Sequence, residues 1–70
     1  MKITYDSEAD VLYIRFRDGK IEESDEVSEV FIVDYDTDGK PIALEILDAS
    51  DILGGKQEIA VDLVKTGVFK

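Results

Sequence analysis

The first two thirds of the chain consist of short segments in which apolar and polar side chains alternate, separated by turn residues at intervals of about ten residues. Within residues 11–16, one face would carry Leu12, Ile14 and Phe16, and the other Val11, Tyr13 and Arg15. An alternation of period two is typical of a strand that buries one face, and a succession of such segments indicates an antiparallel sheet. The sequence therefore predicts a strand-rich α+β fold, an antiparallel β-meander of about five or six short strands.

Turn residues predict where these strands reverse. The cluster at 6–10 should join strands at 2–5 and 10–17 in a first hairpin. The pair Asp18-Gly19 is a strong two-residue turn signal, because the turns that match strand twist need positive φ, and it should lead into a third strand at 20–24. That third strand is charged on both sides, so we expect it at an edge of the sheet.

The segment 30–35 is almost wholly apolar and is predicted to form a central strand, buried on both faces or on one face and a subunit contact. Asp38-Gly39 should close a hairpin into the segment 41–47, and a turn of even length would keep one face apolar. The predicted core face consists of Phe31, Val33, Tyr35, Ile42, Leu44 and Ile46. The opposite, second face would carry Val30, Ile32, Asp34, Ala43, Glu45 and Leu47. That second face is more apolar than solvent usually leaves uncovered, so we expect a helix or a second copy of the chain to cover it.

One short helix is predicted near residues 49–54, with Asp48 or Ser50 as its N-cap and two glycines at 54–55 ending it. The tail at 57–65 alternates as in a strand, although some of its apolar residues would also line one face of a helix. The strand is the favoured interpretation. No linker or repeat interrupts the sequence, and a single domain is expected over residues 1–70.

A chain of this length needs support beyond an ordinary core. Seventy residues lie near the lower limit at which one hydrophobic core is sufficient. The chain has no cysteine and no histidine, which excludes disulfides, thiolate zinc sites and histidine metal ligands. Oligomerisation, a hard cation held by oxygen ligands, or very regular strand pairing remain as sources of support. No cofactor is predicted.

Charge and hydropathy limit the classes of partner. Seventeen acidic residues against eight basic ones give a formal net charge of -9, and phosphate backbones and anionic lipids repel such a field. We therefore expect neither nucleic acid nor membrane as a partner. No basic residue lies between Lys20 and Lys40, so a basic protein or a cation would meet that segment first. No apolar run approaches the roughly 20 residues that span a bilayer, and the N-terminus has no signal-peptide pattern, which predicts a soluble, cytoplasmic protein.

The segment from Asp34 to Glu45 fits the calcium-loop pattern D-x-[DN]-x-[DN]-G-x5-E. A loop of that type lies between two helices, the second of which supplies the final glutamate. Here the preceding sequence is that of a strand, and Pro41 lies where paired loops exchange a backbone hydrogen bond. The segment is therefore interpreted as a hairpin turn in which aspartates cap local N–H groups. The candidate metal ligands are Asp34, Asp36, Asp38 and Glu45.

Two further groups of side chains admit a catalytic interpretation. Asp6, Glu8 and Asp10 could serve as general acid and base if one carboxyl group were buried, but their place in a turn favours capping and solubility. Asp48 and Ser50 could be imagined as base and nucleophile, yet the histidine of an acyl-transfer relay is missing. Helix capping explains both residues.

Basic residues are few, and their interpretation is structural. The patch formed by Arg15, Arg17 and Lys20 is predicted to pair with Glu22 and Glu23 across a hairpin. No glycine-rich phosphate loop is present, because the glycine pair near the C-terminus has neither the spacing nor a following lysine. Nucleotide binding is therefore not predicted.

Three motifs, taken in order, resemble a known family. They are YDSEADVLYIRF at 5–16, DYDTDG at 34–39 and ALEILDAS at 43–50. In a chain this short their combination is similar to the YuzE-like family of small uncharacterised prokaryotic proteins, a domain of unknown function, and the resemblance spans about residues 3–53. It implies a compact, strand-rich α+β domain. The family carries no established activity, so the resemblance implies no catalytic or ligand residues.

The sequence favours a non-enzymatic interaction protein. Such a protein would form a homo-oligomer, a dimer through the second face, and bind a basic protein partner through residues 21–38, in analogy at most with an antitoxin. One alternative is a carboxylate-based magnesium- or manganese-dependent enzyme that uses Asp34, Asp36 and Asp38 or the Asp6–Asp10 group. Another is a calcium-binding structural module that uses the Asp34–Glu45 segment.

Overall fold

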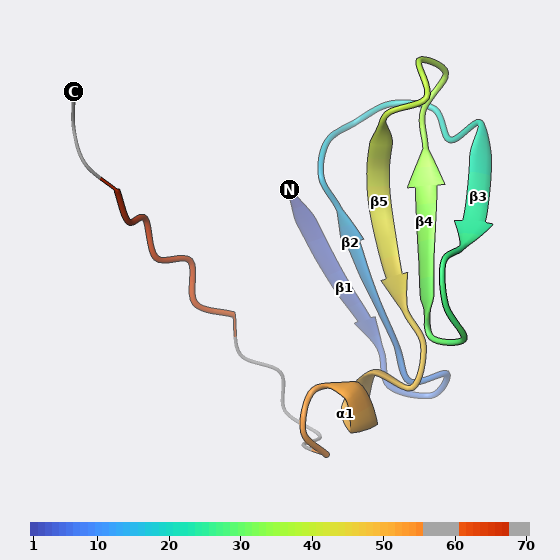
Figure 1. Cartoon of the computed structure of the whole chain (residues 1–70). Helices are drawn as coiled ribbons and strands as arrows, with labels where there is room; N and C mark the ends of the chain where they lie inside the picture. The colour runs from blue at the N-terminus through green and yellow to red at the C-terminus, as the bar shows by residue number, and fades with distance from the viewer. Residues whose placement is uncertain (56–60, 68–70) are drawn as a thin grey trace.

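A computed structural model describes residues 1–55 and 61–67 of the chain. These residues form one antiparallel sheet and one short helix (Figure 1). The elements are β1 (Lys2–Asp6), β2 (Val11–Arg15), β3 (Glu23–Glu26), β4 (Phe31–Tyr35), β5 (Pro41–Ile46) and α1 (Ala49–Ile52). The strands lie in the order β1-β2-β5-β4-β3. This five-stranded antiparallel sheet with a short helix confirms the strand-rich fold predicted from the alternation.

The connection between β2 and β3 departs from a simple meander. β2 pairs with β5, whereas β3 pairs with β4 at the far edge of the sheet. Residues 16–22 therefore pass across the ends of β5 and β4 (Figure 1), and the N–H of Glu22 donates to the carbonyl oxygen of Tyr35 at 2.8 Å. The predicted hairpin through Asp18-Gly19 is wrong, because the apolar β5 offers β2 a buried partner that the charged third strand does not. The edge position predicted for the charged strand is confirmed, although the strand covers Glu23–Glu26 and not residues 20–24.

A bulge at the start of β5 keeps the apolar sides of β4 and β5 together. Tyr35 lies opposite Pro41, but Val33 lies opposite Leu44, so Ile42 is an extra residue on β5. The loop between the two strands is of odd length, and without the extra residue the side chains of β5 would alternate onto the wrong faces. The face predicted as the core consequently forms, with Phe31, Val33, Leu44 and Ile46 on one side.

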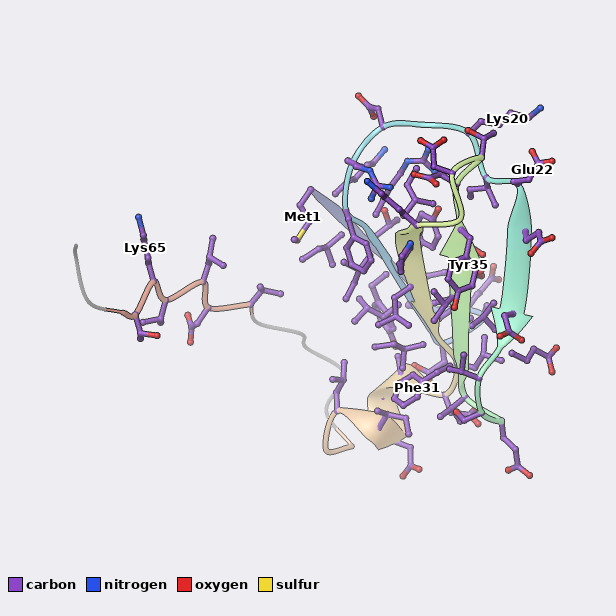
Figure 2. All side chains as sticks on the ribbon, turned by 45° about the horizontal axis from the view of Figure 1, so that its top comes forward. Met1, Lys20, Glu22, Phe31, Tyr35 and Lys65 are labelled. Carbon is purple, nitrogen blue, oxygen red and sulfur yellow. The ribbon has the colours of Figure 1, made fainter. Side chains whose placement is uncertain are left out.

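The two sides of the sheet differ in chemistry. We call the side with the predicted core the apolar face; on β1, β2, β4 and β5 it consists of Ile3, Tyr5, Leu12, Ile14, Phe31, Val33, Tyr35, Ile42, Leu44 and Ile46. The edge strand β3 adds Glu23 and Asp25 to the same side. Figure 2 shows Phe31 and Tyr35 on the same side of β4. The other side, the polar face, carries Lys2, Thr4, Asp6, Val11, Tyr13, Arg15, Ser24, Glu26, Ile32, Asp34, Ala43 and Glu45.

Most of the core lies at the two ends of the apolar face, and the fully buried Ala43 lies on the polar face opposite Asp34. Leu12, Ile46 and Ala49 form a buried cluster, through which α1 packs against the sheet. At the other end, Ile42 is fully buried and lies next to Gly19 of the connection 16–22. Between these ends the side chains are half-buried, because no second layer covers them within the described residues.

Residues 31–35 form an interior strand, as predicted, because β4 pairs with β5 on one side and with the edge strand β3 on the other. The predicted burial on both faces is not found: Asp34 is 2% exposed, whereas the other side chains of β4 are half-buried. Because β3 is short and fully exposed, it gives β4 less cover than β2 and β4 give to β5.

Gly19 should not tolerate a side chain. Its φ of +149° favours glycine, and an added Cβ would lie 2.7 Å from Cδ1 of the buried Ile42. We expect Gly19→Ala to lower the free energy of unfolding by about 2 kcal/mol or more, through backbone strain and overpacking together. Gly39→Ala is the matched control, because Gly39 has a φ of +78° but nothing within 4 Å of its added Cβ, and it should cost about 1 kcal/mol. Urea denaturation measures both variants, and equal losses would show that the contact with Ile42 is unimportant.

The helix is shorter than predicted, and the described part of the tail contains no regular secondary structure. α1 ends at Ile52 instead of residue 54, and Asp48 is its N-cap without a side-chain capping hydrogen bond. The two glycines at 54–55 follow it with φ of 98° and 75°, as expected for a helix end. Residues 61–67 are exposed and belong to no helix or strand, so the predicted strand at 57–65 is wrong for 61–65, and 57–60 lie outside the described residues. No helix of the described chain is long and apolar enough to cross a membrane.

Candidate functional site

Asp36 organises the turn between β4 and β5. Its Oδ1 accepts hydrogen bonds from the N–H groups of Asp38 and Lys40, both at 2.9 Å, and its Oδ2 forms an ion pair with Arg17. These contacts lower the pKa of Asp36, and the hydrogen bond from Lys40 is the largest cause. The aspartate capping predicted for this turn is confirmed at Asp36.

Asp34 and Glu45 meet on the polar face. Asp34 lies opposite Ala43 and Ile32 lies opposite Glu45, so the two carboxyl groups are diagonal neighbours on adjacent strands. Asp34 is 2% exposed and accepts a hydrogen bond from Ser24 Oγ at 2.6 Å. Burial raises the pKa of Glu45, and the charge of Asp34 and a hydrogen bond with Asp34 raise it further. The sequence analysis placed both residues on the second face but did not predict that they are neighbours, because that depends on the register of β4 with β5.

The candidate metal ligands therefore occupy separate places. Asp34 and Glu45 lie together on the polar face, Asp36 is bonded within the turn, and Asp38 is exposed in that turn. Within residues 1–55 and 61–67, no three or more carboxylates are grouped so that they could hold a metal ion. The calcium interpretation and the magnesium or manganese interpretation stay predictions without a converged ligand set in that part of the chain.

Replacing Glu45 with glutamine should stabilise the protein at neutral pH. Because the pKa of Glu45 is raised on folding, the folded protein binds its proton more tightly, and stability falls as the pH rises from the ordinary glutamate pKa of about 4.3 through the folded value. Glutamine keeps the shape and removes the charge, so the free energy of unfolding at pH 7 should rise by about 1 kcal/mol or less. Denaturation of both proteins at several pH values measures this gain, which should vanish below about pH 4. A gain that persists at acidic pH would contradict the assignment to Glu45.

Asp10 joins the first hairpin to the helix. Its Oδ1 accepts hydrogen bonds from Tyr5 Oη at 2.6 Å and from the N–H of Ser50 at 3.0 Å, and its Oδ2 accepts one from Ser50 Oγ at 2.7 Å. Its carbonyl oxygen accepts a further bond from the N–H of Ala49 at 2.9 Å. The bond from Tyr5 is the largest cause of the lowered pKa of Asp10, and it raises the pKa of Tyr5. An aspartate with a lowered pKa is a weaker base, so this arrangement suits anchoring better than activation of the Ser50 hydroxyl.

The three carboxylates of the first turn have separate roles. Oδ1 of Asp6 accepts hydrogen bonds from the N–H groups of Glu8 and Ala9 at 3.0 and 3.2 Å, which confirms the predicted capping. Asp10 faces Tyr5 and α1 instead. Sequence reasoning missed this second role, and the only signal was that Asp10 and Ser50 both lie in motifs that resemble one family.

The arginines bind neighbours other than those predicted. Arg17 donates to the carbonyl oxygen of Pro41 at 2.7 Å and pairs with Asp36, while Arg15 contacts Tyr13 Oη at 3.3 Å and the carbonyl oxygen of Gly19. The predicted pairing with Glu22 and Glu23 is wrong for both arginines, because β3 lies at the far edge of the sheet and not beside β2. Both guanidinium groups hold the ends of strands and the crossing connection in place.

The far edge of the sheet carries a row of unpaired negative charges. We call this row the acidic edge; it consists of Glu22, Glu23, Asp25, Glu26 and Glu29. All five side chains are exposed, and none contacts a basic side chain in the described part of the chain. Within the described residues the sheet therefore has an apolar face without a second layer and a charged edge.

Comparison with protein families places the chain in one of them. The chain belongs to the family described as "Protein of unknown function (DUF2283)", whose model matches residues 2–50. The match extends from β1 to α1 and includes Tyr5, Asp10 and Ser50. No curated protein and no solved structure matches the chain.

Proposed function

We propose that this is a cytoplasmic, non-enzymatic interaction protein, which packs its apolar face against a second copy and binds a basic protein partner along its acidic edge. The observation that carries the proposal is that no second layer of the described residues covers the middle of the apolar face; α1 packs at one end of that face and the connection 16–22 lies at the other. Stable domains bury a sheet face against a second layer. A second copy supplies that layer as an identical sheet, which gives a two-layered sandwich.

The proposed contact surface differs from the one expected from the sequence. The second face, where the sequence suggested a contact, carries the buried Asp34 and the Glu45 whose pKa is raised by burial. Covering these carboxyl groups with another chain would remove them further from water, which is costly without a paired cation. On the side of the apolar face the charged side chains, Glu23 and Asp25, belong to the exposed edge strand β3, so we place the contact on β2, β5 and β4.

Self-association is tested on the full chain in solution. Sedimentation velocity at about 100 μM should give a mass of at least twice that of one chain, because an apolar face of this kind is rarely left open to solvent. A strictly monomeric protein at that concentration would contradict the proposal.

The basic partner is tested through the charge of the acidic edge. Its carboxylates are exposed, so a partner held by them should be captured at low salt and released by about 0.3 M salt, where surface charges are screened. A matched variant combines Glu23→Gln, Asp25→Asn and Glu26→Gln, which keeps size and removes charge. Capture of a basic protein by the wild type and not by this variant would support the proposal. Capture that responds to neither salt nor the substitutions would contradict it.

The family match is compatible with a closer relation to the YuzE-like proteins. All three motifs that resemble the YuzE-like proteins lie within the matched residues 2–50, which supports that finer assignment. The analogy with an antitoxin rests on small size and negative charge, and it makes a basic toxin the first partner to test.

A further inference from the structure

The two edges of the sheet differ in how they resist pairing with other strands. An edge strand exposes unpaired N–H and C=O groups, and charged side chains are a common protection. β3 carries Glu23, Asp25 and Glu26, so a second β3 would be repelled. β1 carries one cation, Lys2, and one anion, Asp6, at its opposite ends, and no strand of the described residues pairs with its outer side (Figure 1). β1 is therefore an unprotected edge.

We propose that β1 pairs antiparallel with β1 of a second copy across a two-fold axis, which joins two sheets edge to edge. In the register centred on Thr4, Lys2 of one copy faces Asp6 of the other, and Ile3 faces Tyr5. Each contact occurs twice, because a two-fold interface uses the same surface on both copies. Opposite charges and aromatic–aliphatic pairs both stabilise directly opposed residues in antiparallel strands.

Charge pairing and the faces on which the side chains lie both favour this register over its neighbours. It pairs every residue of β1, whereas the neighbouring registers that keep the same faces together lose both contacts between Lys2 and Asp6. It also places the apolar faces of the two copies on the same side of the joined sheet. Ile3 and Tyr5, which would face each other, lie on the apolar face, and Thr4 lies on the polar face. The joined sheet would therefore present one continuous apolar face.

We call this contact between the β1 strands of two copies the seam, and the side chains that it needs are available. Lys2, Ile3, Thr4 and Asp6 are all exposed, and Ile3 is 39% exposed. Oδ1 of Asp6 caps its own turn, which leaves Oδ2 for Lys2 of the second copy. The seam does not involve the centre of the apolar face, so it is independent of the contact under the proposed function. Both contacts together would give a tetramer of two joined sheets packed face to face.

Substitutions on the two-fold axis test the seam. Thr4 faces itself there, so Thr4→Lys and Thr4→Glu each place two like charges opposite one another, and each should halve the mass measured by sedimentation velocity. An equimolar mixture of the two variants should recover the wild-type mass, because lysine then faces glutamate. Thr4→Ser is the control and should leave the mass unchanged. The exposed position of Thr4 allows each substitution without loss of the fold, which far-UV circular dichroism checks.

The outcomes separate the seam from the proposed function. If neither charged variant lowers the mass, or if mixing does not restore it, then a second β1 does not occupy this edge and the inference is overturned. Recovery on mixing requires residue 4 of one copy to face residue 4 of the other. The apolar-face variant Val33→Lys reports on the other contact, so either contact can fail while the other stands.

Discussion

Val33→Lys should halve the mass of the assembly while leaving the sheet folded. Val33 of β4 lies opposite Leu44 of β5, and Leu44 lies opposite Ile14 of β2 on its other side. The three side chains therefore form a row across the middle of the apolar face. In a free protomer the half-buried site lets a lysine extend its ammonium group to water. Between two packed sheets the same ammonium group would lose its water, and pairing with Asp25, which lies opposite residue 33 on β3, would offset only part of that cost. Sedimentation velocity measures the mass, and circular dichroism checks the sheet.

Ile32→Lys is the matched control for this substitution. It places the same side chain one position earlier on the same strand, but on the polar face, where Ile32 lies between Glu26 of β3 and Glu45 of β5. A lysine there gains neighbours of opposite charge, and the mass should equal that of the wild type. Halving by both variants would show that lysine disturbs β4 itself, and no change with Val33→Lys would place the contact elsewhere.

The parts of the fold that could be predicted are those determined by local patterns. Alternation at 11–16 identifies a strand and its faces, because side chains in a strand change side at every residue, and the apolar, β-branched and aromatic run at 30–35 identifies another strand. Charge on both sides of the third strand identifies an edge, because no buried position suits it. Asp36 caps its turn through N–H groups two and four residues away, which is also a local effect.

The choice of neighbouring strands could not be predicted in this way. Asp18-Gly19 has the residues of a tight turn, yet it lies in a connection that crosses the sheet, because β2 gains more from the apolar β5 than from the charged β3. The bulge at Ile42 is also set by packing, since it restores the faces after a loop of odd length. Both features depend on burial of several segments at once.

The same limit applies to the candidate site. Nothing in the spacing of the first turn distinguishes Asp10 from Asp6 and Glu8, and its partner Ser50 lies 40 residues away. The meeting of Asp34 and Glu45 likewise requires the register of β4 with β5, which the bulge determines. Contacts of this kind become visible only when the pairing of strands is known.

Asp10→Ala should give the largest loss of stability among single carboxylate substitutions in the described chain. It removes the acceptor for Tyr5 Oη, for the N–H of Ser50 and for Ser50 Oγ, and these partly buried donors lose a charged partner. Asp10 also has a φ of 56°, which aspartate tolerates better than alanine. For a domain of this size we expect a fall in Tm on the order of 10 °C, measured by thermal denaturation.

Asp48→Ala separates the hydrogen bonds of Asp10 from its backbone strain. Asp48 has a similar φ of 50° but makes no side-chain capping hydrogen bond, so its replacement should reproduce the strain alone and give a clearly smaller fall in Tm. The pKa of Asp10 is lowered on folding, so its stabilising contribution is complete above the ordinary aspartate pKa of about 3.9 and is lost as the pH falls through the lower folded value. The difference between wild type and Asp10→Ala should shrink in that acidic range, whereas the difference for Asp48→Ala should not. Equal losses for the two alanine variants at neutral pH would mean that the link between Asp10 and Ser50 does not hold α1 on the sheet.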